Sequence, residues 1–280
     1  MIYRKKKKDN KRNWARLFSV ACIFVCLCFH TSYSWAGAWL LPKGKGQSIQ
    51  TTLYSSAHMG FDQSGALSQP VRFSKFNSNI YWEHGLSDSY TVILSSNIQD
   101  LNYSSGVDTV DFQGFGQSSI AIRRKLWANR TSIISLQPSV VFRGPGETVS
   151  DAFLGAGGTQ FEMRALAGKS FKLARKDGFI DVQTAWRFRP DGFPDEFRFD
   201  VTTGWRPHPK LQILAQTFYA NASKPPNLAL SRQTKSFKAQ ASFVYEKSAR
   251  TSYQVGTYQT IGGQDTIKEN AFFLAIQKRY

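Results

Sequence analysis

Charged side chains recur at alternate positions in segments whose other positions are apolar. Glu162 and Arg164 are two residues apart, and so are Arg198 and Asp200. Residues two apart on a β-strand point to the same face of a sheet, so each pair shares one face. Such a face suits two kinds of chemistry. Rings of one charge sign select ions in a narrow pore, whereas opposite charges pair in a packed interior.

The alternation predicts one set of inward-facing charges along the chain. The candidate selectivity residues are Lys75, Arg123, Arg164, Arg187, Arg198 and Lys238, with Glu162 and Asp200 as acidic partners and with Glu83, Asp181 and Glu196 also inside. An excess of arginine and lysine would favour anions or acidic solutes. Salt-bridged packing that plugs the interior is the alternative, and the sequence leaves both open.

Catalytic and metal-binding patterns are weak by comparison. After residue 36 the chain has three histidines, His58, His84 and His208, and no G-x-S-x-G sequence. A serine hydrolase needs a histidine beside its nucleophile, held by a third polar group. Only His58 is expected near a long loop. We therefore predict no catalytic residue, no cofactor and no metal site, and an enzyme ranks third among the function classes.

The first 36 residues predict export. Residues 1–16 hold eight Lys or Arg and one Asp, and an apolar run over residues 17–29 follows. Small residues at Ser34 and Ala36 complete the pattern of a secretory signal peptide cleaved after Ala36. The apolar run is too short for a spanning helix. All three cysteines, Cys22, Cys26 and Cys28, leave with it. Residues 37–280 are then one domain without disulfides or thiolate ligands.

Charge and composition narrow the expected partners. The whole chain carries +17, and the predicted signal accounts for +7 of it, which leaves +10 on residues 37–280. No run of five Lys or Arg remains in that part, so nucleic acid is not an expected partner. Aromatic residues make up 14% of the chain, and the mean hydropathy is −0.35. A membrane β-barrel gives such values, because its polar lumen offsets its apolar outer face.

The chain after residue 36 alternates throughout. We expect twelve strands, centred on 48–57, 73–83, 89–100, 115–126, 131–142, 159–171, 179–188, 196–206, 210–220, 235–246, 251–260 and 270–280. Each has about ten residues, the length that a tilted strand needs to cross a bilayer. The second strand places Ile80 and Trp82 on one face and Tyr81 and Glu83 on the other. Ten or fourteen strands also fit the pattern.

The connections alternate in length. Five are short, at 85–88, 127–130, 174–178, 207–210 and 247–250, and the others, mostly longer, are 58–71, 101–113, 143–157, 189–195, 221–233 and 261–268. Short turns at one end and longer loops at the other are typical of transmembrane barrels. Backbone groups in lipid need partners, which requires a closed sheet. We predict an all-β, antiparallel up-and-down transmembrane barrel, with loops 58–71, 143–157 and 221–233 as its working surface.

The chain resembles the outer-membrane β-barrel proteins of Gram-negative bacteria over residues 37–280. The hairpin YWEHGLSD at 81–88, the strand–turn rhythm and the ending FFLAIQKRY at 272–280 carry the resemblance. In that class, alternating apolar residues before a terminal aromatic residue are the signal read by the barrel assembly machinery. The resemblance implies that Phe272, Leu274, Ile276 and Tyr280 form this signal. It also implies an outer-membrane location, with lipid and the assembly machinery as partners.

Two function classes lead. The first is a channel or facilitator that passes small, acidic solutes through a charged lumen. The second is a non-conducting structural or interaction barrel that binds partners through its outward loops. The sequence names no solute and no oligomeric state.

Overall fold

The structure, a computed structural model, describes residues 37–105, 109–142, 144, 158–190, 194–222 and 234–280. The predicted signal peptide, residues 1–36, lies outside the described residues, as do most of the predicted loops 143–157 and 221–233. The described residues belong to one compact unit. Among them, no helix has the length and apolar character needed to cross a membrane.

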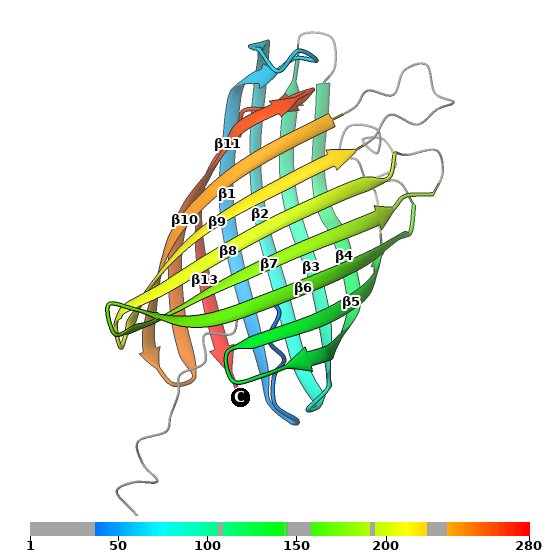
Figure 1. Cartoon of the computed structure of the whole chain (residues 1–280). Helices are drawn as coiled ribbons and strands as arrows, with labels where there is room; N and C mark the ends of the chain where they lie inside the picture. Colours follow the sequence, from blue (N-terminus) through cyan, green and yellow to red (C-terminus); the bar gives the residue numbers. More distant parts are fainter. Residues whose placement is uncertain (1–36, 106–108, 143, 145–157, 191–193, 223–233) are drawn as a thin grey trace, which may run out of the picture. The chain divides into compact units, whose positions relative to one another are not determined.

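Twelve long antiparallel strands make the wall of a closed barrel (Figure 1). They are β1 (Gly46–Phe61), β2 (Leu67–Ser87), β3 (Tyr90–Ser104), β4 (Thr109–Ala128), β5 (Ser132–Phe142), β6 (Gln160–Leu173), β7 (Lys176–Phe188), β8 (Glu196–His208), β9 (Leu211–Ala222), β10 (Thr234–Ser248), β11 (Thr251–Gln264) and β13 (Asn270–Arg279). The two-residue strand β12 (Thr266–Ile267) pairs with β1. Consecutive wall strands pair in chain order, and β1 closes the barrel by pairing with both β2 and β13. The predicted all-β, up-and-down, twelve-stranded fold is confirmed.

The two faces of the wall follow the alternation of the sequence. On β2, Ile80 is 54% exposed on the outer face, whereas Glu83 is 3% exposed on the inner face. On β13, Phe272 is exposed and Phe273 is buried. The outward apolar side chains occur on strands all around the barrel and include Phe76, Ile80, Leu94, Ile120, Phe161, Phe199, Phe243 and Leu274. Apolar side chains outside and polar ones inside match a wall surrounded by lipid.

Short turns join the strands at one end of the barrel, here called the turn end. The β2–β3 turn occupies Asp88 and Ser89, later than the predicted 85–88, because Ser87 still pairs with Tyr90. The β6–β7 turn consists of Ala174 and Arg175, with φ values of 50° and 63°. Two left-handed residues in a two-residue hairpin turn match the right-handed twist of the flanking strands.

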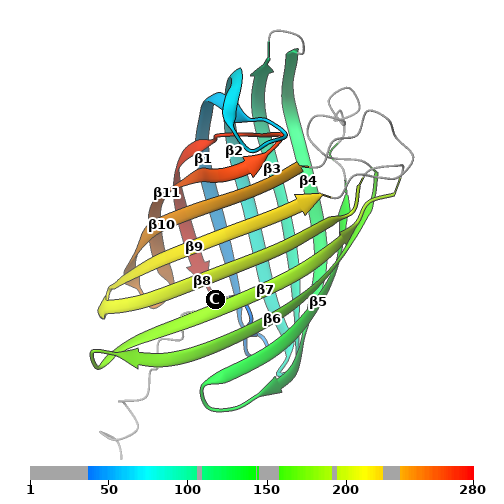
Figure 2. The same ribbon diagram turned by 45° about the horizontal axis from the view of Figure 1, so that its top comes forward.

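At the opposite end, the loop end, several strands run further than predicted. The predicted loop 58–71 shortens to residues 62–66, and the predicted loop 101–113 is mostly strand, with Ser104 paired to Thr109. Polar residues outside the lipid continue the hydrogen bonding between neighbouring strands, because this bonding uses the backbone and does not need alternating apolar side chains. Strands β1–β4 therefore have 15 to 21 residues, against 11 to 14 in β5–β9 (Figure 2).

One carboxylate organises the connection between β1 and β2. Asp62 accepts hydrogen bonds from the hydroxyls of Ser64 and Ser68 and from the backbone amide of Ala66. The two hydroxyl bonds are the main reason that the pKa of Asp62 falls from 3.8 to about 2.

The end of the chain lies on the seam where the barrel closes. The Tyr280 amide donates to the Gly46 carbonyl at 3.0 Å, and the Gly46 amide donates to the Tyr280 carbonyl at 3.2 Å. The predicted assembly residues Phe272, Leu274, Ile276 and Tyr280 are all exposed. Their recognition by the assembly machinery stays a prediction.

Candidate functional site

Residues 37–42, here called the inner segment, lie inside the barrel at its turn end. The Ala38 amide donates to Asp181 Oδ2 on β7 at 2.7 Å, and the Ala38 carbonyl accepts from Ser135 Oγ on β5 at 2.7 Å. The Trp39 carbonyl accepts from Arg123 Nη1 on β4 at 3.0 Å. Three strands therefore hold the segment through inward-facing side chains, and Ala38 is 0% exposed.

Apolar contacts also hold the inner segment. Ala38 packs with Ile133 of β5 and Leu166 of β6 in a buried cluster. The Trp39 ring meets the Phe179 ring edge-on, with centroids 6.1 Å apart. A Cβ atom on Gly168 would lie 2.4 Å from the Trp39 ring, so only glycine leaves room for it there. The turn end of the lumen is thus partly filled by the chain itself.

The chain enters the barrel beside Gly85 of β2. The Gly44 amide donates to the Gly85 carbonyl at 2.8 Å, and the Gly85 amide donates to the Lys45 carbonyl at 2.9 Å. A Cβ atom on Gly85 would lie 2.3 Å from the Pro42 carbonyl oxygen. Glycine at this position lets the two backbones approach closely enough for the chain to turn inward.

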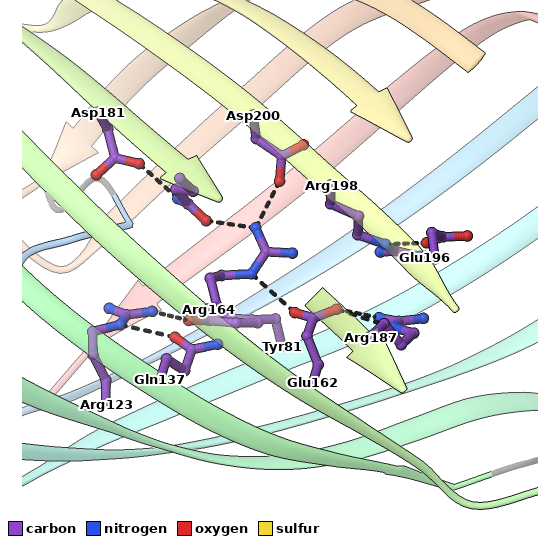
Figure 3. A network of polar contacts seen from close by, with 11 residues as sticks. Tyr81, Arg123, Gln137, Glu162, Arg164, Asp181, Arg187, Glu196, Arg198 and Asp200 are labelled. Carbon is purple, nitrogen blue, oxygen red and sulfur yellow. Dashed lines mark hydrogen bonds and ion pairs between the residues drawn. The ribbon is translucent and has the colours of Figure 1, made fainter. Parts of the chain in front are cut away.

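A network of ion pairs covers the inner wall formed by β6, β7 and β8 (Figure 3). Glu162 accepts from Arg187 Nη2 at 2.8 Å and from Arg164 Nε at 2.9 Å. Arg164 also donates through Nη1 to Asp200 Oδ2 at 2.6 Å, two strands away. The same Arg164 Nη1 donates to Gln183 Oε1 on β7 at 2.8 Å, and Gln183 faces Asp200 in the register. Glu196 faces Arg187 in the register and accepts from Arg198 and from Arg189.

Arg123 of β4 links side chains of β2 and β5 to the inner segment. Besides the Trp39 carbonyl, it donates to Gln137 Oε1 at 3.0 Å and to the Tyr81 hydroxyl at 3.3 Å, and it lies 3.5 Å from Glu83 Oε2. Its side chain is only 6% exposed. The guanidinium of Arg123 therefore has a structural role, because its N–H donors bind protein groups.

A separate group of four residues, here called the lysine cluster, lies toward the loop end. Lys75 of β2 and Lys238 of β10 approach Glu269 at 3.4 Å and 2.6 Å, and the Tyr258 hydroxyl donates to Glu269 at 2.6 Å. Glu269 directly precedes β13, so the cluster spans the seam of the barrel. It brings together the two lysines among the predicted selectivity residues.

The inward charges that water reaches most easily are positive. The side chains of Lys75, Arg198 and Lys238 are 24%, 30% and 30% exposed. Their partners Glu196 and Glu269 are 10% and 3% exposed. Asp200, at 18%, is the most exposed acid in these networks. A solute in the lumen would therefore meet mainly cationic groups, although most inward charges are paired.

All eight predicted lumen residues face inward, and they divide into four groups. Glu162, Arg164, Arg187 and Asp200 share one network, and Arg198 pairs with Glu196 beside it. Lys75 and Lys238 share the lysine cluster, and Arg123 binds the inner segment. Sequence reasoning missed Glu269 and the turn-end group Arg206, Glu246 and Arg279. Glu269 precedes its strand, and the alternation could have placed it inward by extension. The role of these residues in selectivity stays a prediction.

Two of the three histidines after residue 36, His84 and His208, serve in packing and in a turn. The His84 ring stacks between those of Trp82 and Tyr280, at centroid distances of 5.7 Å and 6.0 Å. His208 Nδ1 accepts from the Lys210 amide at 3.3 Å. Within the described ranges, no three His, Cys, Asp or Glu side chains gather as a metal site would require.

Known structures share this fold. The chain is similar to the COG4313 outer membrane channel from Pseudomonas putida F1, with a TM-score of 0.66, 11% identity and coverage of 88% of this chain and 99% of that one. It is also similar to the NanC porin (TM-score 0.55, 8% identity, 82% and 98% covered) and to the translocator domain of the autotransporter NalP from Neisseria meningitidis (0.56, 9%, 96% and 98%). No family model and no curated protein matches the sequence. The chain therefore has the fold of outer-membrane β-barrels, as the resemblance in its sequence implied.

Proposed function

We propose that the chain is an outer-membrane channel that passes small solutes and prefers anions. The observation that carries this proposal is the charge that the lumen presents: its most exposed ionised side chains are Lys75, Arg198 and Lys238, while their carboxylate partners are largely covered. Charged rings at close quarters set the sign of the ions that pass. The fold of the channel-like and porin neighbours supports the same reading.

The two ends of the barrel support an orientation in the membrane. In outer-membrane barrels the short turns face the periplasm and the longer loops face outward. The turn end would then be periplasmic and would carry the inner segment and Tyr280. Export would depend on a signal peptide cleaved after Ala36, and insertion on the barrel assembly machinery and on lipid.

The second candidate is a barrel that does not conduct solutes and binds partners through its loops. The inner segment favours this candidate, because Ala38 and Trp39 occupy lumen space at the turn end and are bonded to three strands. An enzyme is the third candidate. The contacts of His84 and His208 do not support it, because these rings lie in packing and in a turn.

A solute-uptake assay separates the first two candidates. Proteoliposomes with refolded 37–280 should swell in isotonic sodium acetate or gluconate faster than in a chloride salt of an organic cation of similar size. Empty liposomes and liposomes with a heat-unfolded sample serve as controls. Swelling rates equal to the controls, from a sample that shows the gel shift of a folded barrel, would overturn the channel proposal.

A further inference from the structure

Two lysines from distant parts of the chain converge on one carboxylate inside the barrel. Lys75 Nζ lies 3.4 Å from Glu269 Oε1, and Lys238 Nζ lies 2.6 Å from Glu269 Oε2. Two ammonium groups against one carboxylate leave the cluster with a surplus of one positive charge. Within a lumen of reduced dielectric constant, such a surplus attracts an anion more strongly than it would in bulk water.

Glu269 is held firmly in the middle of the cluster. The Thr260 amide donates to the Glu269 carbonyl at 2.8 Å, and the Glu269 amide donates to the Thr260 hydroxyl at 3.3 Å. The Tyr258 hydroxyl donates to the Glu269 carboxylate at 2.6 Å. The carboxylate is 3% exposed, so a solute in the lumen would meet the ammonium groups before it met the acid.

Each lysine keeps donors for a further partner. An ammonium group has three N–H donors. Lys238 gives one of them to Glu269, and Lys75 is within ion-pair distance of the same acid. Both side chains remain partly exposed, at 24% and 30%. The unused donors are therefore within reach of an oxyanion in the lumen.

Aromatic surface lies next to both ammonium groups. Lys238 Nζ is 5.0 Å from the centroid of the Tyr258 ring, and Lys75 Nζ is 5.8 Å from that of the Phe73 ring. Both rings are partly buried and keep some exposed surface. Paired cations beside apolar faces suit a ligand that joins a carboxylate to a carbon skeleton, rather than a small inorganic ion.

We propose that Lys75 and Lys238 form a binding site for the carboxylate of a small organic acid, with Phe73 and Tyr258 contacting its carbon atoms. This inference rests on the proposed function and names the class of solute. Glu269 acts as a positioning residue that keeps the two ammonium groups side by side and limits affinity to the transient binding that passage requires.

Calorimetric titration of refolded full-length barrel 37–280 in detergent tests the site without measuring conduction. Benzoate is the probe, and inorganic phosphate is titrated in parallel. We expect saturable binding of benzoate that is weakened about tenfold by Lys75→Met or by Lys238→Met, because each removes a charge-assisted hydrogen bond. Lys172→Met removes an equal charge from an exposed turn-end pair and should leave binding unchanged.

Glu269→Gln distinguishes a binding site from a merely structural cluster. Glutamine keeps the size of the side chain and an acceptor oxygen for the two lysines but removes the competing negative charge, so benzoate should bind severalfold more tightly. A gel-shift assay confirms that each variant folds. Unaltered benzoate affinity in both lysine variants, weaker binding in Glu269→Gln, or equal affinity for phosphate and benzoate would each overturn the proposal. Absence of conduction would overturn the channel function only. The binding site is tested by the calorimetric titrations, which do not depend on conduction.

Discussion

The carboxylate of Asp181 lies 2.7 Å from the backbone nitrogen of Ala38, although 143 positions separate the two residues in the chain. Asp181 is 0% exposed, and its other oxygen accepts from the side-chain nitrogen Nε2 of Gln183 at 2.6 Å. A buried carboxylate pays a large desolvation cost unless its neighbours compensate it. This contact therefore fixes where the inner segment lies within the lumen.

The position of Gly37 makes the contact relevant to export. A Cβ atom on Gly37 would lie 2.9 Å from Asp181 Oδ1, so the backbone of this residue is directly beside the carboxylate. Cleavage after Ala36 would place a new α-ammonium group at Gly37. We expect that group to pair with Asp181 in the mature protein and to strengthen the hold on the inner segment.

Removing the inner segment should enlarge the pore. A barrel that begins at Lys43 lacks Ala38 and Trp39 and loses their bonds to Asp181, Ser135 and Arg123. We expect a larger single-channel conductance than that of 37–280, measured in the same salt. Asp181→Leu should also raise the conductance of 37–280, yet have little effect in the shortened barrel. Equal conductance of the long and short barrels would show that the segment does not narrow the pore.

Arg198 is the most informative residue for ion selectivity. Its side chain is 30% exposed, whereas that of Arg164 is 12% exposed and bound by two carboxylates. Arg198→Gln should lower the anion-to-cation permeability ratio, determined from the reversal potential across a salt gradient. Arg124→Gln removes the same charge from an exposed position beside Tyr90 and serves as the control. A ratio that shifts equally in both variants would argue against a role for the lumen charge.

Glu162 holds the ion-pair network of the inner wall together. Glu162→Gln would leave Arg164 and Arg187 short of a partner in a poorly solvated place, which costs about 3–5 kcal/mol for a buried pair. We expect this loss in the free energy of unfolding, measured by urea titration of the barrel in detergent. Asp177→Asn breaks the exposed pair with Lys172, where both side chains are over 60% exposed, and should cost about 0–1 kcal/mol. Similar losses in the two variants would contradict the structural role of the network.

The outer face should reject charge where the inner face tolerates it. Ile80 and Asn79 are neighbours on β2 that point outward and inward. Ile80→Lys should lower the free energy of unfolding in lipid by about 2–4 kcal/mol, because it places an ammonium in the hydrocarbon layer. Asn79→Lys should have a much smaller effect. Comparable effects in a lipid bilayer would mean that the apolar belt does not face lipid.

The wall of the barrel could be predicted from the sequence because the faces of a strand depend only on residues that are neighbours in the chain. A period of two in the side chains gives strands and faces, and all twelve predicted strands have a counterpart in the structure. Boundaries were less accurate at the loop end, where β1 and β2 continue through residues read as loop. Outside lipid, strands of polar residues pair as well as strands of apolar ones. The alternation in the sequence therefore does not show where the strands end.

The inner segment could not be predicted, because its contacts are long-range. Gly37 and Ala38 have no pattern that distinguishes them from a solvated linker, and the partners of Ala38, Ser135 and Asp181, lie 97 and 143 positions away in the chain. The pairing of Glu162 with Arg164, two residues apart, was predicted correctly. The expected pairing of Arg198 with Asp200 was wrong, because Arg198 pairs with Glu196 and Asp200 with Arg164. Pairings across strands, such as Arg164 with Asp200, depend on the register and emerged only from the structure.

Single-channel recording of refolded 37–280 in a planar bilayer tests the central claim most directly. The gel shift of a folded barrel is established first, and a potassium chloride gradient across the bilayer reports selectivity. We predict discrete conductance steps with a reversal potential that is closer to the equilibrium potential of chloride than to that of potassium. A folded barrel that gives no steps, or steps that favour potassium, would contradict the account of an anion-preferring channel.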